Sequence, residues 1–402
     1  MSLGITRTSR LLIAYMLMVN LSTMVFMGFY IFFLQANGLS YMEMTIVFAA
    51  NFLALALFDL PTGNLADKYG RKRSILIGTV IFAIGLLVYA LTSSFLLFLT
   101  AEVVLGVGSA LLSGSLEAWY VDDLKGQGKA AEAERVYGLA VGLVALVGIL
   151  GGIIGSVLAL YTLSLPILFG SLVCFAAAVL VALTFKENYG NEQARYTEIV
   201  KRTLSYFGRS PALKLLTVAE LFRFACVVVY IFLYQPFLVA AGLPASSLGL
   251  VFAGMMLLSA AGSLLATKLM ARTRKSYLVM GSVVCVMVPL MAVTLVEGLW
   301  AATALFLVCS FAHGLAMPPA MIWRNSLIPS DMRASGLSVM STFTNGTNAA
   351  LSLAMGAIIT SLGIGVAFYF GALAGAICLP LLLLADRESR KVPDEMKAPL
   401  PA

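Results

Sequence analysis

The chain has 402 residues, of which 61% are hydrophobic and only 11% are charged, and its mean hydropathy is +0.98. This composition excludes a water-soluble globular domain and a disordered chain, and it indicates a protein that crosses a membrane many times. The net charge of +7 requires no nucleic-acid partner, because membrane proteins keep excess Lys and Arg in their cytoplasmic loops.

Twelve apolar runs are long enough to span a bilayer as helices. We predict an all-α membrane protein whose spans cover residues 11–34, 42–60, 74–92, 95–120, 137–161, 164–185, 213–240, 246–270, 276–296, 299–323, 337–361 and 363–385. The first run ends without a small-residue cleavage pattern, so we expect it to be retained. The one long polar stretch predicts an N-terminal six-helix bundle over 1–185, a central cytoplasmic loop over 186–212, a C-terminal six-helix bundle over 213–385 and a cytoplasmic tail over 386–402.

The basic residues predict the orientation of the spans. With the N-terminus in the cytosol, every Lys and Arg except Arg223 lies in a cytoplasmic connection or terminus. This bias predicts a multi-pass protein of the inner or plasma membrane with both termini cytoplasmic. The five cysteines all fall in apolar runs, which favours buried small side chains over a disulfide framework or a metal cluster.

The stretch DLPTGNLADKYGRKRS, from Asp59 to Ser74, places a dense polar and basic loop between the second and third spans. Gly63 and Gly70 permit tight turns and close helix approach. Asp67 can accept hydrogen bonds from a helix N-terminus, and Arg71 holds the loop in the cytosol. The stretch resembles the Gly-x-Leu-Ala-Asp-Arg-x-Gly-Arg-Lys-x signature of the major facilitator superfamily, which lies between the second and third helices of that family.

This resemblance implies a transporter with two six-helix bundles around a cavity that opens alternately to either side. Helices 1, 4, 7 and 10 would line the cavity, and the RASGLSVMS run from Arg333 is similar to efflux-type permeases. The resemblance also implies a cytoplasmic gate, in which Asp67 meets the N-terminus of helix 11. Arg71 would pair there with Asp122 or Asp123, and we place Asp59 in the gate rather than in the substrate site.

Charged side chains inside apolar spans are the strongest independent sign of a transport path. Each costs about 2.5 to 3.5 kcal/mol at the bilayer centre, and such residues are usually kept for a pathway or a partner. The spans that the resemblance assigns to the cavity hold Glu102, Glu117, Glu220, Arg223 and His313. Asn20 and tyrosines of the first and seventh spans, including Tyr30, can contact substrate, although packing roles are open for them too.

Glu102 is the first candidate for a proton or cation site, because desolvation there would let it take up and release a proton. The alternative is a buried carboxylate that is hydrogen-bonded to a neighbouring helix. Many relatives carry Arg at this place, four residues before a Gly-x-Gly, so their chemistry cannot be transferred to Glu102. Glu220 and Arg223 share a helix face, and they can form a static ion pair, exchange partners, or bind an anion through Arg223.

Two further residues have equally open interpretations. Glu117 lies within about one turn of the inner boundary, so it is either a cavity residue or an acid that reaches out through an aromatic belt. His313 can relay protons near neutral pH or hydrogen-bond a backbone carbonyl.

No Gly-x-x-x-x-Gly-Lys-Ser/Thr loop is present, which argues against ATP as the energy source. A single histidine and the lack of paired carboxylates at catalytic spacing argue against an enzyme, a cofactor or a metal site. We predict a monomeric secondary active transporter in the lipid bilayer, exporting a small amphipathic or cationic compound in exchange for protons, because acids outnumber the arginine in the spans. Uptake or exchange of an organic anion bound by Arg223, and a non-transporting receptor with the same fold, remain open.

Overall fold

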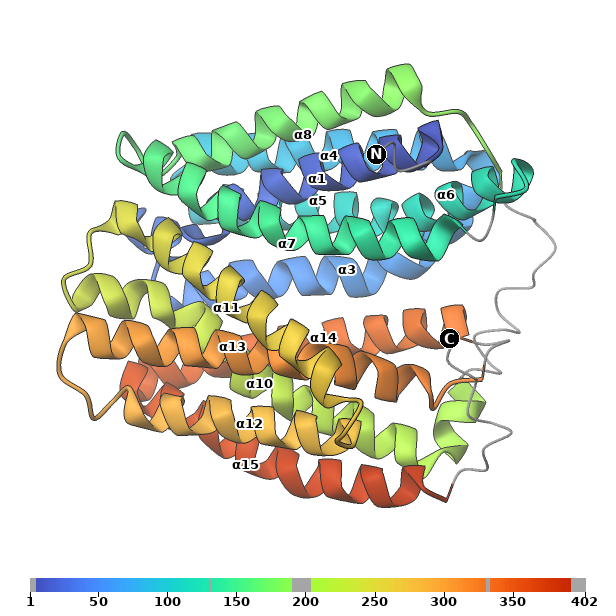
Figure 1. Cartoon of the computed structure of the whole chain (residues 1–402). Helices are drawn as coiled ribbons and strands as arrows, with labels where there is room; N and C mark the ends of the chain where they lie inside the picture. The colour runs from blue at the N-terminus through green and yellow to red at the C-terminus, as the bar shows by residue number, and fades with distance from the viewer. Residues whose placement is uncertain (1–4, 130–131, 190–203, 330–332, 392–402) are drawn as a thin grey trace. The chain divides into compact units, whose positions relative to one another are not determined.

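The computed structural model describes residues 5–129, 132–189, 204–329 and 333–391 (Figure 1). Within these ranges every regular element is a helix, which confirms the predicted all-α class. The elements are α1 (Arg7–Met27), α2 (Tyr30–Ala36), α3 (Tyr41–Tyr69), α4 (Arg71–Leu91), α5 (Phe95–Leu112), α6 (Ser115–Gly126), α7 (Glu132–Ala159), α8 (Leu165–Thr184), α10 (Pro211–Ala240), the short 3₁₀ helix η1 (Ala245–Ser247), α11 (Leu248–Leu269), α12 (Lys275–Ala292), α13 (Leu299–Asn325), α14 (Arg333–Leu362) and α15 (Ile364–Ser389).

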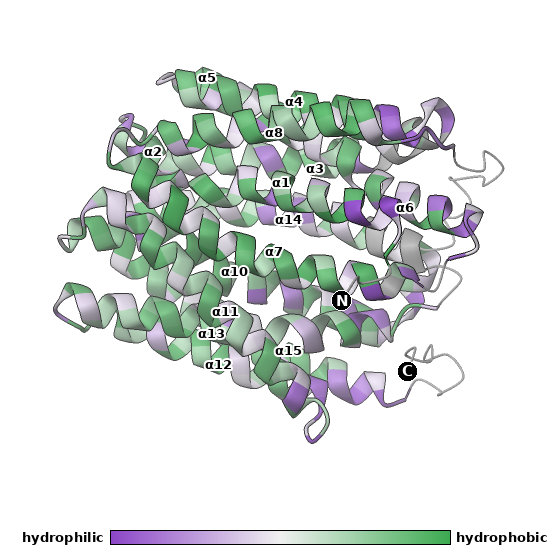
Figure 2. Ribbon diagram, turned by 45° about the horizontal axis from the view of Figure 1, so that its top comes forward, coloured by the Kyte–Doolittle hydropathy of each residue, from purple (hydrophilic) through white to green (hydrophobic). Residues whose placement is uncertain are grey.

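Eleven helical stretches of the described chain are long and apolar enough to cross a membrane. In Figure 2 the ribbons of α4 and α5 are mostly green, the colour of hydrophobic residues, whereas hydrophilic residues in purple occur along α6. The remaining predicted span, 337–361, falls on α14, which has 30 residues but no comparably apolar stretch. Its polar residues include Ser341, Thr342, Thr344, Asn345, Thr347 and Asn348.

Two predicted spans are interrupted in the structure. The first is divided into α1 and α2 by a break at Gly28 and Phe29, so that α2 is a separate helix of seven residues. The fourth is divided into α5 and α6 at Ser113 and Gly114, where Gly114 has a φ of 71°. Helices α2 and α5 carry Tyr30 and Glu102 of the candidate site described below.

The polar stretch from Asp59 to Ser74 is helical rather than a loop, contrary to the sequence-based expectation. Helix α3 continues to Tyr69, and α4 begins at Arg71, so that Gly70 alone separates them. Gly70 has a φ of 109°, a conformation that residues with a side chain rarely adopt. The sequence pattern identified the turn glycine but underestimated how far the helix extends into the polar segment.

Contacts divide the chain into two units, and each is described by itself. Unit 1 comprises Met1–Gln193 with Pro244–Ala253, and unit 2 comprises Ala194–Leu243 with Gly254–Ala402. In unit 1, α1 packs on α7 and α8, while α5 packs on α3 and α4. In unit 2, α10 packs on α15, and α12 packs on α13 and α15. Much of the segment 186–212 that we predict as the connecting loop lies outside the described residues.

Glycines on α5 set the spacing of its helix contacts in unit 1. A Cβ on Gly106 would lie 2.5 Å from the Cβ of Ala54 on α3, and one on Gly108 would lie 2.8 Å from the backbone N of Phe82 on α4. Small residues allow such close approach of membrane helices. The face of α5 that bears Glu102 is thereby packed tightly between its neighbours.

Candidate functional site

Glu102 lies on α5 in the interior of unit 1, and only 4% of its surface is exposed. The Tyr30 hydroxyl on α2 donates a hydrogen bond of 2.8 Å to its Oε1. Asn51 on α3 donates from Nδ2 to the backbone carbonyl of Glu102 at 3.3 Å. Within the described ranges no Lys, Arg or His forms an ion pair with Glu102. The site therefore consists of a buried carboxyl group without a compensating cation.

Aromatic rings surround this carboxyl group. Tyr89 on α4 stacks on Tyr30 with ring centroids 5.8 Å apart, and it lies 4.9 Å from the ring of Phe98. Phe33 contacts both Tyr89 and Phe98, at 6.0 Å and 5.8 Å. The Tyr89 hydroxyl is buried, lies within hydrogen-bonding reach of the Tyr30 hydroxyl, and is close enough to Glu102 to interact with it electrostatically.

A second cluster of charged groups lies in unit 2. Arg223 on α10 donates from Nε and Nη2 to Oε2 of Glu220, at 2.8 Å and 2.6 Å. His313 on α13 and Arg223 line a cavity of about 10 Å³ together with Ser282 on α12. That volume is close to the minimum for a single water molecule.

Two buried polar atoms of this cluster lack partners among the described groups. They are Oε1 of Glu220 and Nδ1 of His313. An unsatisfied buried polar atom costs about 1–3 kcal/mol, so such atoms mark places where a water molecule, a proton or a ligand group binds. The cluster holds one positive charge that is already engaged by a carboxylate, and it keeps one carboxylate oxygen and one imidazole nitrogen available.

Arg71, the arginine of the sequence motif, begins α4 and makes an ion pair there, at the end of the helix remote from its turn into α5. Arg71, which is 7% exposed, pairs with Asp122 on α6. Its Nη1 also donates to the carbonyl of Ala118 at 2.9 Å. Asp123, the other acid named from the sequence, accepts instead from Thr8 at 2.5 Å and from Gln127 at 2.7 Å. The two adjacent acids thus connect α6 to different helices.

Glu187 belongs to the same network, and the sequence analysis did not identify it. Its Oε1 accepts from the backbone N–H of Lys72 at 2.8 Å, in the first turn of α4. A Cβ on Gly70 would lie 2.5 Å from the Glu187 carboxyl carbon. A carboxylate at a helix N-terminus is favoured by the helix dipole. The only sequence signal was an isolated acid that follows the sixth span, and such acids are common.

The remaining candidates are dispersed. Asp59 lies beside Ser113, at the break between α5 and α6. Glu117 is exposed on α6 near Tyr137 of α7. Asn20 donates to the Met16 carbonyl of its own helix at 2.8 Å. Gly63 and Asp67 lie on α3, but their surroundings are outside what the structure describes, as are the side chains of residues 333–335 at the start of α14, the eleventh predicted span, which Asp67 was expected to meet.

The structure therefore brings some of the predicted residues together and leaves others apart. Glu220, Arg223 and His313 form one group, Arg71 and Asp122 form another, and Glu102 lies in unit 1 with tyrosines as its neighbours. Tyr30 and Tyr89 were not expected as partners of Glu102. The described residues contain no group of three or more His, Cys, Asp or Glu side chains that could hold a metal ion.

A sequence model described as Major Facilitator Superfamily matches residues 11–319 and 216–401 of the chain. The chain belongs to this superfamily. This superfamily consists of multi-pass membrane transporters rather than enzymes. Among solved structures, the nucleoside transporter NupG has a TM-score of 0.76 at 14% identity, covering 95% of this chain and 99% of that one. A D-xylose-proton symporter has a TM-score of 0.73 at 12% identity, covering 93% and 96%. At such low identity these similarities establish the fold alone.

Curated relatives of the superfamily transporter match over parts of their length. Multidrug resistance protein 2 of Bacillus subtilis (strain 168) is 25% identical over 161 residues, which are 40% of this chain and 39% of that protein. The molybdate-anion transporter of Xenopus tropicalis is 26% identical over 308 residues, 71% of this chain and 65% of that protein. A transporter from Methanocaldococcus jannaschii is 24% identical over 168 residues, 42% of each chain. The matches therefore cover less than two thirds of each of these relatives.

Proposed function

We propose that this superfamily member is a secondary active transporter that works by alternating access and exports a small amphipathic or cationic compound in exchange for protons. In this proposal it resides in the inner or plasma membrane with both termini in the cytosol. Glu102 is the group that takes up and releases the proton. Arg71 and Asp122 belong to the cytoplasmic gate.

The observation that carries the proposal is the environment of Glu102. The residue is 4% exposed, and its carboxyl group accepts a hydrogen bond from a tyrosine hydroxyl. A buried carboxylate without a partner cation costs several kcal/mol. The carboxyl group therefore has a reason to bind a proton when it is occluded and to exchange it for a cation when it is accessible.

The second cluster supports a cationic substrate over an anionic one. Both Arg223 donors that point toward Glu220 bind the same carboxylate oxygen, so the positive charge of Arg223 is largely compensated. The other oxygen of Glu220 and Nδ1 of His313 are without partners in the described chain. These atoms can accept hydrogen bonds from an ammonium or amide group of a substrate.

The anion alternative has one specific point in its favour, which is the similarity to a relative named a molybdate-anion transporter. In that alternative, protonation of Glu220 would release Arg223 to bind an oxyanion. Lys lacks the planar fork that binds an oxyanion bidentately. Molybdate or organic-anion uptake that fails in Arg223→Lys and persists in Glu102→Gln would therefore favour the anion function.

Reconstituted proteoliposomes test the main proposal. With lipophilic cations as test substrates, we expect an imposed pH gradient to drive uphill accumulation by the wild type. Glu102→Gln should abolish uphill accumulation but retain substrate exchange between the two sides, because exchange requires no net proton transfer. Uphill accumulation that is unchanged in Glu102→Gln would contradict the role of Glu102. Binding without movement of any test compound would favour the receptor alternative.

A further inference from the structure

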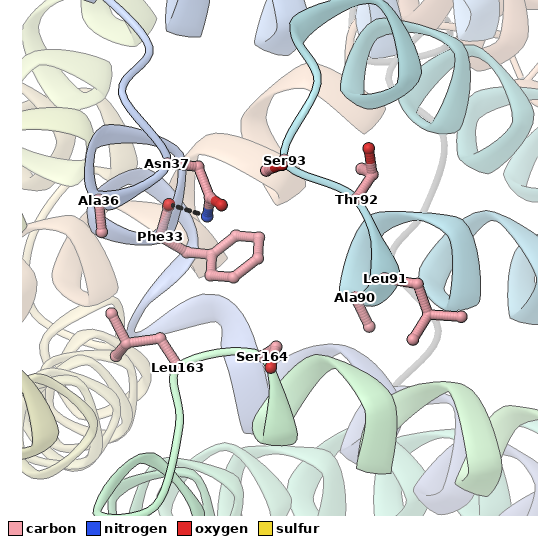
Figure 3. Close-up of a pocket in the computed structure, with 9 residues that line it drawn as sticks. All are labelled: Phe33, Ala36, Asn37, Ala90, Leu91, Thr92, Ser93, Leu163 and Ser164. Atoms are coloured by element: carbon pink, nitrogen blue, oxygen red, sulfur yellow. Dashed lines mark hydrogen bonds between the residues drawn. The ribbon is translucent and has the colours of Figure 1, made fainter.

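Unit 1 contains a pocket at the turn between α4 and α5, distinct from the sites discussed above. Its volume is about 310 Å³, and it is open to the surface at the end of α4 that lies opposite Arg71. Polar groups of Asn37, Thr92, Ser93 and Ser164 form much of its lining. Figure 3 shows the ring of Phe33 pointing into the space that the other labelled residues surround. The pocket is large enough for several water molecules.

Phe33, which lines this pocket, belongs to a layer of three aromatic rings. Phe33 is 4% exposed, Tyr89 is 1% exposed and Phe98 is fully buried. Their centroids are 4.9 to 6.0 Å apart, so the rings are in mutual contact. Phe33 is the member of the three that also lines the pocket.

Glu102 and its partner Tyr30 each lie about one helical turn from a ring of this layer, on α5 and α2. Phe33 lies three residues after Tyr30 on α2. Phe98 is four residues from Glu102 on α5. One turn corresponds to about 5.4 Å along a helix axis. The Tyr89 hydroxyl is buried, within hydrogen-bonding reach of the Tyr30 hydroxyl and within electrostatic reach of Glu102.

We propose that protons pass between this pocket and Glu102 through unit 1 itself, across a passage that the Phe33 ring closes. This inference rests on the proposed function, in which Glu102 binds the coupling proton. A hydronium ion in the pocket gives its proton to the Tyr89 oxygen, and the Tyr89 hydroxyl proton moves to the Tyr30 oxygen. The Tyr30 hydroxyl proton then moves to Oε1 of Glu102. Both tyrosines end neutral, one water molecule stays in the pocket, and the carboxylate becomes a carboxylic acid.

The arrangement of α2 provides the movement that this passage needs. The helix has seven residues and is separated from α1 by the break at Gly28 and Phe29. It carries both Phe33 and Tyr30. A small rotation of α2 would therefore withdraw the ring from the pocket and reorient the hydroxyl that contacts Glu102 in one step.

Infrared spectroscopy of the purified protein tests the passage without requiring transport. The C=O stretch of a protonated carboxyl group shifts when its proton is replaced by deuterium, and the band of Glu102 is identified by its loss in Glu102→Gln. After transfer to D₂O we expect this band to exchange at least ~10-fold faster in Phe33→Ala than in the wild type, the gain from removing about 1.4 kcal/mol of barrier.

Phe26→Ala is the matched control. Phe26 is 4% exposed, as Phe33 is, and its ring contacts Tyr30 at 6.5 Å, but it does not line the pocket. Its removal should leave the exchange rate near that of the wild type. An unchanged rate in Phe33→Ala, or equal acceleration in both variants, would overturn the passage. If Glu102→Gln removes no carboxyl band at any pH, the proposed function fails rather than the passage alone.

Reversible chemical modification at the rim of the pocket gives a second measurement, and it is made on protein that has already folded. Ser93 is exposed at the rim of the pocket, so Ser93→Cys can be modified with a bulky methanethiosulfonate. We expect modification to slow the exchange of the Glu102 band and a reductant to restore it. The wild type treated in the same way controls for Cys285, the exposed native cysteine of the described chain. Exchange that is unaffected by the modification would exclude this pocket as the proton source.

Discussion

At the scale of single residues, the two charged clusters differ in how their charge is balanced. Glu102 is surrounded by tyrosine hydroxyls and aromatic rings, whereas Glu220 and Arg223 neutralise each other. Desolvation penalises an isolated buried charge more than a paired one. The first arrangement suits a group that changes protonation state, and the second suits a group that changes partners.

The ion pair of unit 2 leads to a prediction about stability. Arg223→Gln leaves the Glu220 carboxylate in a buried site without its partner, and we expect a loss of roughly 3–5 kcal/mol of unfolding free energy. The double variant with Glu220→Gln should lose clearly less than the sum of the two single variants. Denaturant unfolding in detergent micelles measures all three. Additive losses would mean that the two side chains are not energetically coupled.

The residue types of the site could be predicted from the sequence, but their partners could not. Charged residues in apolar spans identified Glu102, Glu220, Arg223 and His313, and the spacing of three identified the Glu220–Arg223 pair. The contacts of Glu102 with Tyr30 and Tyr89 depend on how α2, α4 and α5 pack. Helical periodicity within one element carries no information about such packing. Glu187 was missed for the same reason, because it reaches Gly70 from the end of α8, which packs beside α4.

At the scale of elements, the turn between α3 and α4 depends on a glycine for two separate reasons. Gly70 has a positive φ and also leaves room for the Glu187 carboxylate. We expect Gly70→Ala to lower the melting temperature more than Gly128→Ala. Gly128 also has a positive φ, 68°, but a Cβ there would meet no atom within 4 Å. Equal shifts would show that backbone strain alone accounts for the effect.

The contact between the starts of α1 and α7 predicts a pH dependence. Glu132 accepts from Ser9 at 2.5 Å and from the Thr6 backbone at 2.8 Å. Partial burial raises the pKa of Glu132, but these hydrogen bonds outweigh it and hold the pKa below its ordinary value. The stabilisation is therefore present above the pKa of the unfolded chain, and it is lost as the pH falls through the lower pKa of the folded protein.

Thermal unfolding as a function of pH measures this effect. The wild type should be more stable than Glu132→Gln at neutral pH, and the difference should shrink as the pH is lowered. A difference that does not depend on pH would mean that the carboxylate charge contributes nothing to the contact.

The sequence predicted that the elements are membrane-spanning helices, but it did not predict where each helix breaks or ends. Long apolar runs identified the spans, because lipid leaves the backbone no alternative to a helix. The breaks after α1 and α5 and the extension of α3 to Tyr69 did not follow from hydropathy. Pattern reasoning cannot detect a break inside an apolar run, and it reads polar residues as a loop even where the helix continues.

At the scale of the whole molecule, the Arg71–Asp122 ion pair connects the family motif to α6. We expect Asp122→Asn to change turnover while leaving substrate affinity nearly intact, because the pair belongs to the proposed gate and not to the substrate site. Asp123→Asn is the matched control, since that acid contacts Thr8 and Gln127 instead. Initial rates and binding of the same substrate give the comparison. A large loss of affinity with normal turnover would contradict the gating role.

The central claim is that Glu102 exchanges a proton for substrate. Its most direct test is the proton balance of substrate binding in weakly buffered, detergent-purified protein, followed with a pH-sensitive dye. We predict that a cationic substrate releases protons from the wild type and that Glu102→Gln binds it without release. Equal release from both proteins, or binding to the wild type without any release, would contradict the account.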